Sequence, residues 1–314
     1  MPNYNHAAFL ETRIQSVLNQ TYPEFELIIL DDCSTDNSKN IIEKYAGHAK
    51  VSAVVYNEAN SGSPFKQWAK GIALAKGEWI WIAESDDDCK ANFLETLISA
   101  AEAKADCCMA FCKSYTIQNA TVKKEYKDDS ADAYLTSAEC FEKYLLFENK
   151  IFNASMVIFK RAAALQVPVS YTTFTFCGDW LFWIYLAKQG NVFASGKRLN
   201  YYRQHGADVS STMYASGSNF PEEIKLLEIL RQEKFADDAI LKKALWKKYD
   251  KYLGRSRSFT TEANRQIANA FLQFFQTRIA FIFFSLKAKC FRLLKHPKEI
   301  SFLFFSNRKS TIAS

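Results

Sequence analysis

The chain has 314 residues, a net charge of +6, and 48% hydrophobic and 24% charged residues. This composition is that of a globular protein and excludes intrinsic disorder, and the length suffices for one large domain or two small ones. The sequence has no arginine-rich block and no zinc-finger spacing, so we expect no nucleic-acid partner. With no CxxC pair among its eight cysteines, no signal peptide and no long uncharged apolar run, it predicts a cytoplasmic protein without a transmembrane helix.

Strands and helices alternate through the first third of the chain. Apolar runs predict strands at residues 25–30, 51–56, 80–83 and 107–112. The intervening segments carry apolar residues at helical spacing, and Asn5 is expected to cap the first helix. This alternation predicts an α/β fold with a mostly parallel sheet and right-handed crossovers.

Two of the predicted strands end in carboxylates. These are Asp31 and Asp32 after the strand at 25–30, and Glu84, Asp86, Asp87 and Asp88 after the strand at 80–83. Parallel strands bring their carboxyl ends to one edge, where open α/β sheets bind ligands. Clustered like charges repel one another unless a cation neutralises them, and hard divalent cations prefer oxygen ligands. We therefore expect a ligand site with a divalent ion, and the alternative is a solvated acidic loop.

The second half of the chain is predicted to be more helical. Asp179 opens a predicted helix, where it is either a functional carboxylate or a simple cap. We expect a first domain over residues 1–215 and a helical region over 216–314. Residues 262–295 predict one long helix, rich in Phe and dotted with Arg and Lys. This helix either packs on the first domain or lies on an anionic membrane surface.

Several short motifs, in order, resemble the family 2 glycosyltransferases of GT-A fold, which is Rossmann-related. The motifs are PNYN at 2–5, SVLNQTYP at 16–23, DDCSTD at 31–36, NSG at 60–62, AKGE at 75–78, ESDD at 84–87, GDW at 178–180 and YRQH at 202–205. The resemblance covers residues 2–210. It implies an inverting transferase that moves a sugar from a nucleotide donor, expected to be a UDP-sugar, to a saccharide or lipid-linked acceptor in cell-surface polysaccharide or glycolipid synthesis. The expected location is cytoplasmic, peripheral on the inner face of the plasma membrane.

The resemblance also implies roles for individual residues. Asp179 matches the general base, and Asp32 is expected to accept a hydrogen bond from the nucleotide base. The implied donor-binding residues are Pro2, Tyr4, Asn5, Asp32, Asn60, Gly62, Glu84, Ser85, Asp86 and Arg203. The implied ligands of a Mn²⁺ or Mg²⁺ ion are Glu84, Asp86, Asp87 and His205. Glu84 stands where the family usually has Asp, so Asp86 is the safer ligand, and Ala69 stands where the family often has Asn.

One departure from the family concerns the first strand. The family opens with an apolar strand just before its Pro-x-Tyr-Asn segment, whereas here only Met1 precedes Pro2. That strand would lie between the strands ending at Asp32 and Asp86, and each backbone group left unpaired by its absence costs about 1–3 kcal/mol. We expect either that the natural chain begins upstream or that this chain is a truncated, impaired remnant. A non-catalytic binding protein on the same fold and a nucleotidyltransferase remain as alternative functions.

Overall fold

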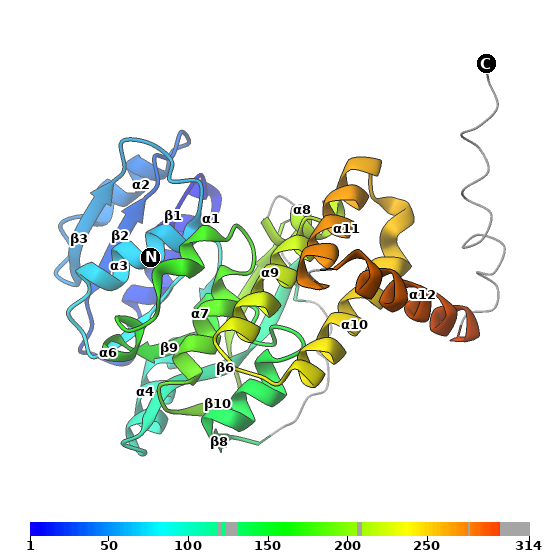
Figure 1. The fold of residues 1–314 in the computed structure, drawn as a ribbon. Helices are drawn as coiled ribbons and strands as arrows, with labels where there is room; N and C mark the ends of the chain where they lie inside the picture. Colours follow the sequence, from blue (N-terminus) through cyan, green and yellow to red (C-terminus); the bar gives the residue numbers. More distant parts are fainter. Residues whose placement is uncertain (119–120, 123–130, 206–208, 276, 296–314) are drawn as a thin grey trace. The chain divides into compact units, whose positions relative to one another are not determined.

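The computed structural model describes residues 1–118, 121–122, 131–205, 209–275 and 277–295. The chain divides into two compact units, Met1–Asp208 and Val209–Ser314. The first unit contains the strands and several helices, and the second contains helices in its described residues (Figure 1). The boundary predicted from the sequence, after residue 215, lies a few residues further along the chain.

The first unit follows the predicted alternation and then adds strands and short helices. Its strands are β1 (Pro2–Asn3), β2 (Leu27–Asp31), β3 (Val51–Tyr56), β4 (Trp79–Trp81), β5 (Asp88–Cys89), β6 (Cys107–Gln118), β7 (Thr121–Val122), β8 (Ala133–Leu135), β9 (Val157–Lys160) and β10 (Asn191–Gln204). Its α-helices are α1 (Ala7–Leu18), α2 (Ser38–Tyr45), α3 (Pro64–Leu74), α4 (Phe93–Glu102), α5 (Ser137–Cys140), α6 (Arg161–Ala164) and α7 (Gly178–Ala187). Shorter turns are the π-helix η1 (Phe141–Leu145) and the 3₁₀ helices η2 (Ala154–Met156) and η3 (Val169–Thr173).

The strands form two sheets. The first has the order β1-β2-β3 and is parallel throughout. The second has the order β4-β9-β6-β10-β5, with β7 on β6 and β8 on β10. It is mixed, because β9 runs antiparallel to both β4 and β6, whereas β6 and β10 are parallel. The predicted α/β class is confirmed, and the antiparallel β9 is a feature that the alternation did not reveal.

The core of the first sheet explains why its helices form. Leu10, Ile14 and Val17 of α1 are buried at positions i, i+4 and i+7, so one face of the helix packs onto Ile29 of β2. The predicted helix cap is wrong, because His6 occupies the N-cap position. Asn5 has a positive φ of 55° and its side-chain oxygen accepts from the Thr35 N–H at 2.7 Å. Asn5 therefore ties two loops together.

A cavity of about 230 Å³ separates β2 from β4. Strand β1 has two residues and pairs only with β2, while the described residues form no ladder between the two sheets. The cavity wall includes Leu27 and Leu30 of β2 and Trp79 and Trp81 of β4. This gap lies where the sequence led us to expect an additional central strand.

The second unit is helical over its described residues. Its helices are α8 (Val209–Ser216), α9 (Asn219–Gln232), α10 (Asp238–Arg255), the 3₁₀ helix η4 (Ser256–Ser258), α11 (Thr261–Phe275) and α12 (Arg278–Lys295). The single long helix predicted over residues 262–295 is wrong, because α11 and α12 meet at a bend of 116°. Thr277 precedes α12 and caps its start, because its hydroxyl oxygen accepts a hydrogen bond from the Ala280 N–H at 3.3 Å.

None of the described helices is, by itself, both long and apolar enough to span a bilayer. Helices α11 and α12 meet the length and composition criteria only as a pair, across their bend.

Candidate active site

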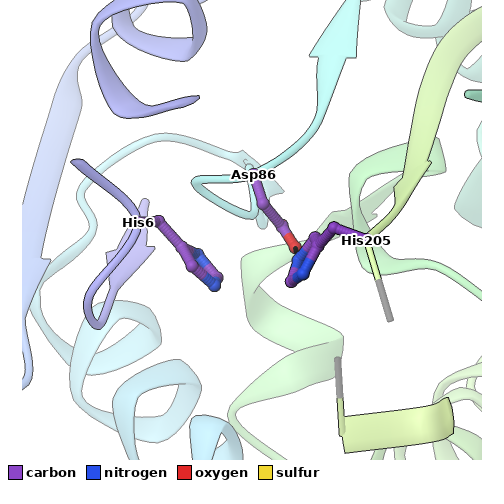
Figure 2. A group of neighbouring side chains, drawn as sticks. All are labelled: His6, Asp86 and His205. Carbon is purple, nitrogen blue, oxygen red and sulfur yellow. Dashed lines mark hydrogen bonds and ion pairs between the residues drawn. The ribbon is translucent and has the colours of Figure 1, made fainter. Parts of the chain in front are cut away.

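Three side chains from separate segments converge on one point. His6 lies at the start of α1, Asp86 follows β4, and His205 follows β10. Figure 2 shows the two imidazoles and the carboxylate pointing toward one another, and their ligand atoms lie within 4.8 Å of each other. Nε2 of His205 lies 3.2 Å from Oδ2 of Asp86. We call this group the His6–Asp86–His205 cluster.

Neighbouring side chains hold the cluster in place. Nδ1 of His6 lies 2.8 Å from the hydroxyl oxygen of Ser85, which is buried. Phe9 stacks on the His205 ring with centroids 5.4 Å apart. Arg203 donates from Nε to the Asp86 carbonyl at 2.9 Å, and its guanidinium carbon lies 4.9 Å from the centre of the Phe9 ring. The loop after β4, the end of β10 and the start of α1 are thus connected by direct contacts.

Asp86 is electrostatically distinct from its neighbouring acids. Burial acts to raise its pKa, but the hydrogen bond with His205 and the proximity of His6 hold the pKa below its usual value. The Asp86 carboxylate is therefore ionised at neutral pH, which is the form that binds cations.

Glu84 and Asp87 point to other partners. Glu84 accepts a hydrogen bond from the Trp68 indole at 2.9 Å, and burial followed by repulsion from Asp86 raises the pKa of Glu84 to about 8. Asp87 accepts from the Asn153 amide at 2.8 Å and from the Arg203 N–H at 3.0 Å. Burial, again followed by Asp86, raises the pKa of Asp87 to about 6. Neither carboxylate is part of the His6–Asp86–His205 cluster.

The Asp32 carboxylate holds a loop. It accepts hydrogen bonds from the Asn57 amide at 2.6 Å, the Gln67 amide at 2.8 Å, and both the N–H and the hydroxyl of Ser61 at 2.9 and 2.7 Å. Asn60 accepts from the Gly62 N–H at 2.8 Å, and Gly62 has a φ of +73°, which favours glycine. Asp32 therefore fixes the turn that carries the predicted residues Asn60 and Gly62.

The predicted residues at the chain start lie beside the Asp31 loop. Pro2 is buried in β1, and Asn3 donates to Asp31 at 2.7 Å. Tyr4 is 44% exposed. Asn5 donates its backbone N–H to the Ser34 hydroxyl at 2.9 Å. Hydrogen bonds of Asn3 and Asn5 thus hold the segment that contains Tyr4 beside the loop that follows β2.

Asp179 lies in the first turn of α7. Its carboxylate accepts from the Asn149 amide at 2.9 Å and from the Trp180 N–H at 2.6 Å. The segment before α7 is joined to the Asp32-held loop, because the Ser63 hydroxyl donates to the Phe174 carbonyl at 3.2 Å. These contacts position Asp179 from both sides of its helix start.

Sequence reasoning did not identify His6 as a site residue. It also missed Asn57, Ser61 and Gln67, which hold Asp32. Their roles depend on contacts across dozens of residues, such as the 79-residue separation of His6 and Ser85. For His6 the available signal was its place directly after the PNYN motif.

Comparisons with known proteins agree with this arrangement. The model of glycosyl transferase family 2 matches residues 1–164. TuaG of Bacillus subtilis, named for teichuronic acid biosynthesis, is 28% identical over 217 residues, which are 68% of this chain and 81% of TuaG. GlyG, a glycosyltransferase of Streptococcus pneumoniae, is 38% identical over 104 residues, which are 33% of this chain and 34% of GlyG.

The fold has solved counterparts. Residues 1–349 of Staphylococcus aureus TarS, crystallised with UDP-GlcNAc, superpose with a TM-score of 0.68 at 21% identity, over 88% of this chain and 79% of that one. The mannosyltransferase PcManGT of Pyrobaculum calidifontis, in complex with GDP-Man and Mn²⁺, gives a TM-score of 0.50 at 12% identity, over 96% of this chain and 86% of that one. The first match shows the GT-A fold. The chain therefore belongs to glycosyl transferase family 2 and is a glycosyltransferase.

Proposed function

We propose that this glycosyltransferase moves a sugar from a UDP-sugar to a hydroxyl of a saccharide or lipid-linked acceptor, with inversion at the anomeric carbon, in the synthesis of a cell-surface polysaccharide or glycolipid. The observation that carries the proposal is the convergence of His6, Asp86 and His205 next to the loops after β1 and β2. The UDP-GlcNAc in the TarS structure supports a UDP-sugar donor. The names of TuaG and of TarS, a poly(ribitol-phosphate) β-N-acetylglucosaminyltransferase, support a surface polymer as the product.

The donor's nucleoside end is assigned to the loops after β1 and β2. Tyr4 offers an exposed ring for stacking, with Pro2 and Asn5 fixing its segment. Asp32 contributes through the turn that it holds, since its carboxylate oxygens already accept hydrogen bonds from four donor groups. To accept a hydrogen bond from the base as well, Asp32 would have to share or exchange one of these donors.

A divalent ion is part of the proposal, and the cluster's donor set fits Mn²⁺ better than Mg²⁺. A carboxylate with two imidazole nitrogens suits first-row transition metals, whereas Mg²⁺ favours oxygen ligands alone. Asp86, His205 and His6 would hold the ion. Glu84 and Asp87, which repel Asp86 electrostatically, would add negative charge next to the ion when they are ionised. Arg203, fixed by the Asp86 carbonyl, would orient the diphosphate. When bound, the ion would supply Lewis-acid stabilisation of the charge on the leaving diphosphate.

Asp179 is assigned as the general base. Its carboxylate would take the proton of the acceptor hydroxyl while that oxygen forms a bond to the anomeric carbon from the face opposite the donor's diphosphate. The bond from the anomeric carbon to the phosphate oxygen breaks at the same time, and its electron pair leaves with UDP. Asn149 keeps one carboxylate oxygen oriented through its amide.

A donor screen combined with one substitution tests this assignment. Asp179→Asn is expected to lower the rate of UDP release in the presence of acceptor by about 10²–10⁴-fold, because a positioned base contributes that much. Donor affinity, measured by calorimetry, is expected to stay within about twofold, since Asp179 contacts the acceptor. The matched control is Asp238→Asn, which changes a first-turn carboxylate of α10.

Three results would contradict the proposal. Full turnover by Asp179→Asn would remove Asp179 as the base. Release of pyrophosphate from a nucleoside triphosphate and a sugar phosphate would instead identify a nucleotidyltransferase. Binding of donor without turnover, across a panel of acceptors, would favour the non-catalytic binding protein.

The proposed location is the cytoplasmic face of the plasma membrane, as a peripheral protein. Lipid-linked acceptors would be met at that surface, and the described helices include none that spans a bilayer by itself. The second unit offers a specific surface for this contact.

A further inference from the structure

Helix α12 packs on the second unit through one face only. The Phe284 ring lies against Trp246 and Tyr249 of α10, with centroids 5.5 and 5.3 Å apart. Ser285 lies 2.6 Å from the Tyr249 hydroxyl, and Ala288 is 2% exposed. These contacts fix the rotation of α12 about its own axis.

The opposite face of α12 is apolar and exposed. Its side chains are spaced three, four or eight residues apart, so they form one stripe along the helix. They are Ile279 (69% exposed), Ile282 (53%), Phe283 (71%), Leu286 (54%) and Leu294 (81%). Within the described part of the chain, these side chains are left open to solvent. Such a patch on a folded protein indicates an interaction site. We call this stripe the α12 face.

Charge identifies the partner of the α12 face. Residues 278–295 contain five basic residues and no acidic one, and the basic residues are Arg278, Lys287, Lys289, Arg292 and Lys295. At 3.6 residues per turn, Lys287 borders the stripe on one side, while Arg278 and Lys289 border it on the other. Long basic side chains in these positions can extend to phosphate groups while the stripe enters an apolar layer.

We propose that the α12 face docks in the boundary between headgroups and acyl chains of a bilayer that contains anionic lipid. An anionic surface complements both basic borders of the stripe. Pairing of the α12 face with a second copy of the chain is disfavoured. A two-fold interface would place the basic borders of one α12 against the basic borders of α12 in the other copy. Arg292 and Asp250, joined at 3.2 Å, help to anchor α12 to α10 while its other face is buried in lipid. This inference stands independently of the reaction proposed above.

Vesicle flotation of the full chain tests the proposal. Wild-type protein is expected to float with phosphatidylcholine vesicles that contain phosphatidylglycerol and to bind about tenfold less to phosphatidylcholine alone. The double variant Ile282→Glu, Phe283→Glu is expected to lose binding to the mixed vesicles by about tenfold or more. Lys287→Glu with Lys289→Glu is expected to lose the preference for anionic lipid.

A matched control separates docking from general surface change. Leu165→Glu with Val169→Glu alters two exposed apolar residues of the first unit, which are 52% and 72% exposed, and should leave flotation unchanged. The substituted positions are exposed, apart from the half-buried Lys289, so equal melting temperatures are expected and would be checked.

Three outcomes would overturn the proposal. They are absence of wild-type binding to the mixed vesicles, equal flotation of wild type and Ile282→Glu, Phe283→Glu, and resistance of the bound protein to extraction by alkaline carbonate, which would indicate insertion across the bilayer. A dimer in light scattering that the double variant dissociates, without vesicle binding, would assign the α12 face to a second copy.

Discussion

At the scale of single residues, the site contains three neighbouring carboxylic acids, Glu84, Asp86 and Asp87, whose pKa values differ. The pKa of Asp86 is held down by His205, whereas burial raises the pKa of Glu84 to about 8 and that of Asp87 to about 6. Neighbouring carboxylates thus differ in charge at neutral pH because their partners differ. A hard cation at Asp86 would favour ionisation of all three.

The pH dependence of stability tests the state of Glu84. Its pKa is raised from 4.5 in the unfolded chain to about 8 in the folded one, so the folded state holds the proton more tightly. The resulting stabilisation is full below about pH 4.5 and is lost as the pH rises through 8. In EDTA, the melting temperature of Glu84→Gln should therefore exceed that of wild type by a margin that grows between pH 5 and 8. Parallel curves for the two proteins would show that Glu84 is already ionised when folded.

His6 shows why part of the site escaped sequence-based prediction. Local patterns marked Asp32, Asp86 and Asp179 as candidate site residues, because each follows a strand or opens a helix and lies in a recognisable motif. The local signal at His6 is only its place directly after the PNYN motif, and its position in the cluster depends on Asp86 and His205, which the fold brings to it. The occupation of Asp32 by Asn57, Ser61 and Gln67 is equally non-local.

At the scale of elements, local apolar patterns predicted β2, β3, α1 and α4 well. They failed where pairing or a break decides the structure. Strand β9 is inserted antiparallel between β4 and β6. Its partners lie 77–81 residues away in β4 and 46–50 residues away in β6, and periodicity does not encode such long-range pairing. The predicted helix over 262–295 breaks at the cap provided by Thr277, which an unbroken apolar pattern concealed.

The start of α7 requires glycine for close packing. A Cβ at Gly178 would lie 2.4 Å from a ring carbon of Phe65 and 2.6 Å from the Tyr171 carbonyl oxygen. Gly178→Ala should therefore destabilise the protein by about 1–3 kcal/mol and lower turnover by displacing Asp179. Urea unfolding measures the first effect. Gly47→Ala is the control, because its Cβ would meet no atom within 4 Å; equal losses in both variants would refute the packing argument.

The second unit contains a buried ion pair between α9 and α10. Lys248 lies 2.6 Å from Glu223, which also accepts from the Asn219 amide at 2.8 Å, and all three residues are buried. Lys248→Met alone should cost about 3–5 kcal/mol, because it leaves a buried carboxylate without its cation. Lys248→Met with Glu223→Leu should recover most of this loss in urea unfolding. A double variant as unstable as the single one would show that the pair itself contributes the stability.

At the scale of the whole molecule, the two units carry different features. The first carries the cluster and the second carries the α12 face. All eight cysteines are free. Cys290 on α12 is exposed, Cys33 in the first unit is partly exposed, and the others are buried, so thiol reactivity can probe each unit separately. Burial raises the pKa of buried thiols such as Cys112 to about 12, which keeps them unreactive.

Thiol labelling therefore follows membrane docking in the intact protein. Cys290 should react fastest with an aromatic disulfide reagent. Vesicles with anionic lipid should slow its reaction, since it lies on the same side of α12 as Phe283 and Leu286. Cys33 of the first unit is the internal control, whose rate should not change. Unaltered reactivity of Cys290 on vesicles that bind the protein would place the contact elsewhere.

We propose that His6, Asp86 and His205 bind a divalent ion together with UDP. Calorimetric titration of UDP into wild-type protein, in Mn²⁺ and in EDTA, tests it most directly, with His48→Asn as a control outside the cluster. We predict that Mn²⁺ tightens UDP binding by at least about tenfold in wild type and in His48→Asn, and that Asp86→Asn and His6→Asn each lose most of that gain. Equal affinity of wild type for UDP with and without Mn²⁺, or an undiminished Mn²⁺ effect in both cluster variants, would show that the cluster does not bind the ion together with UDP.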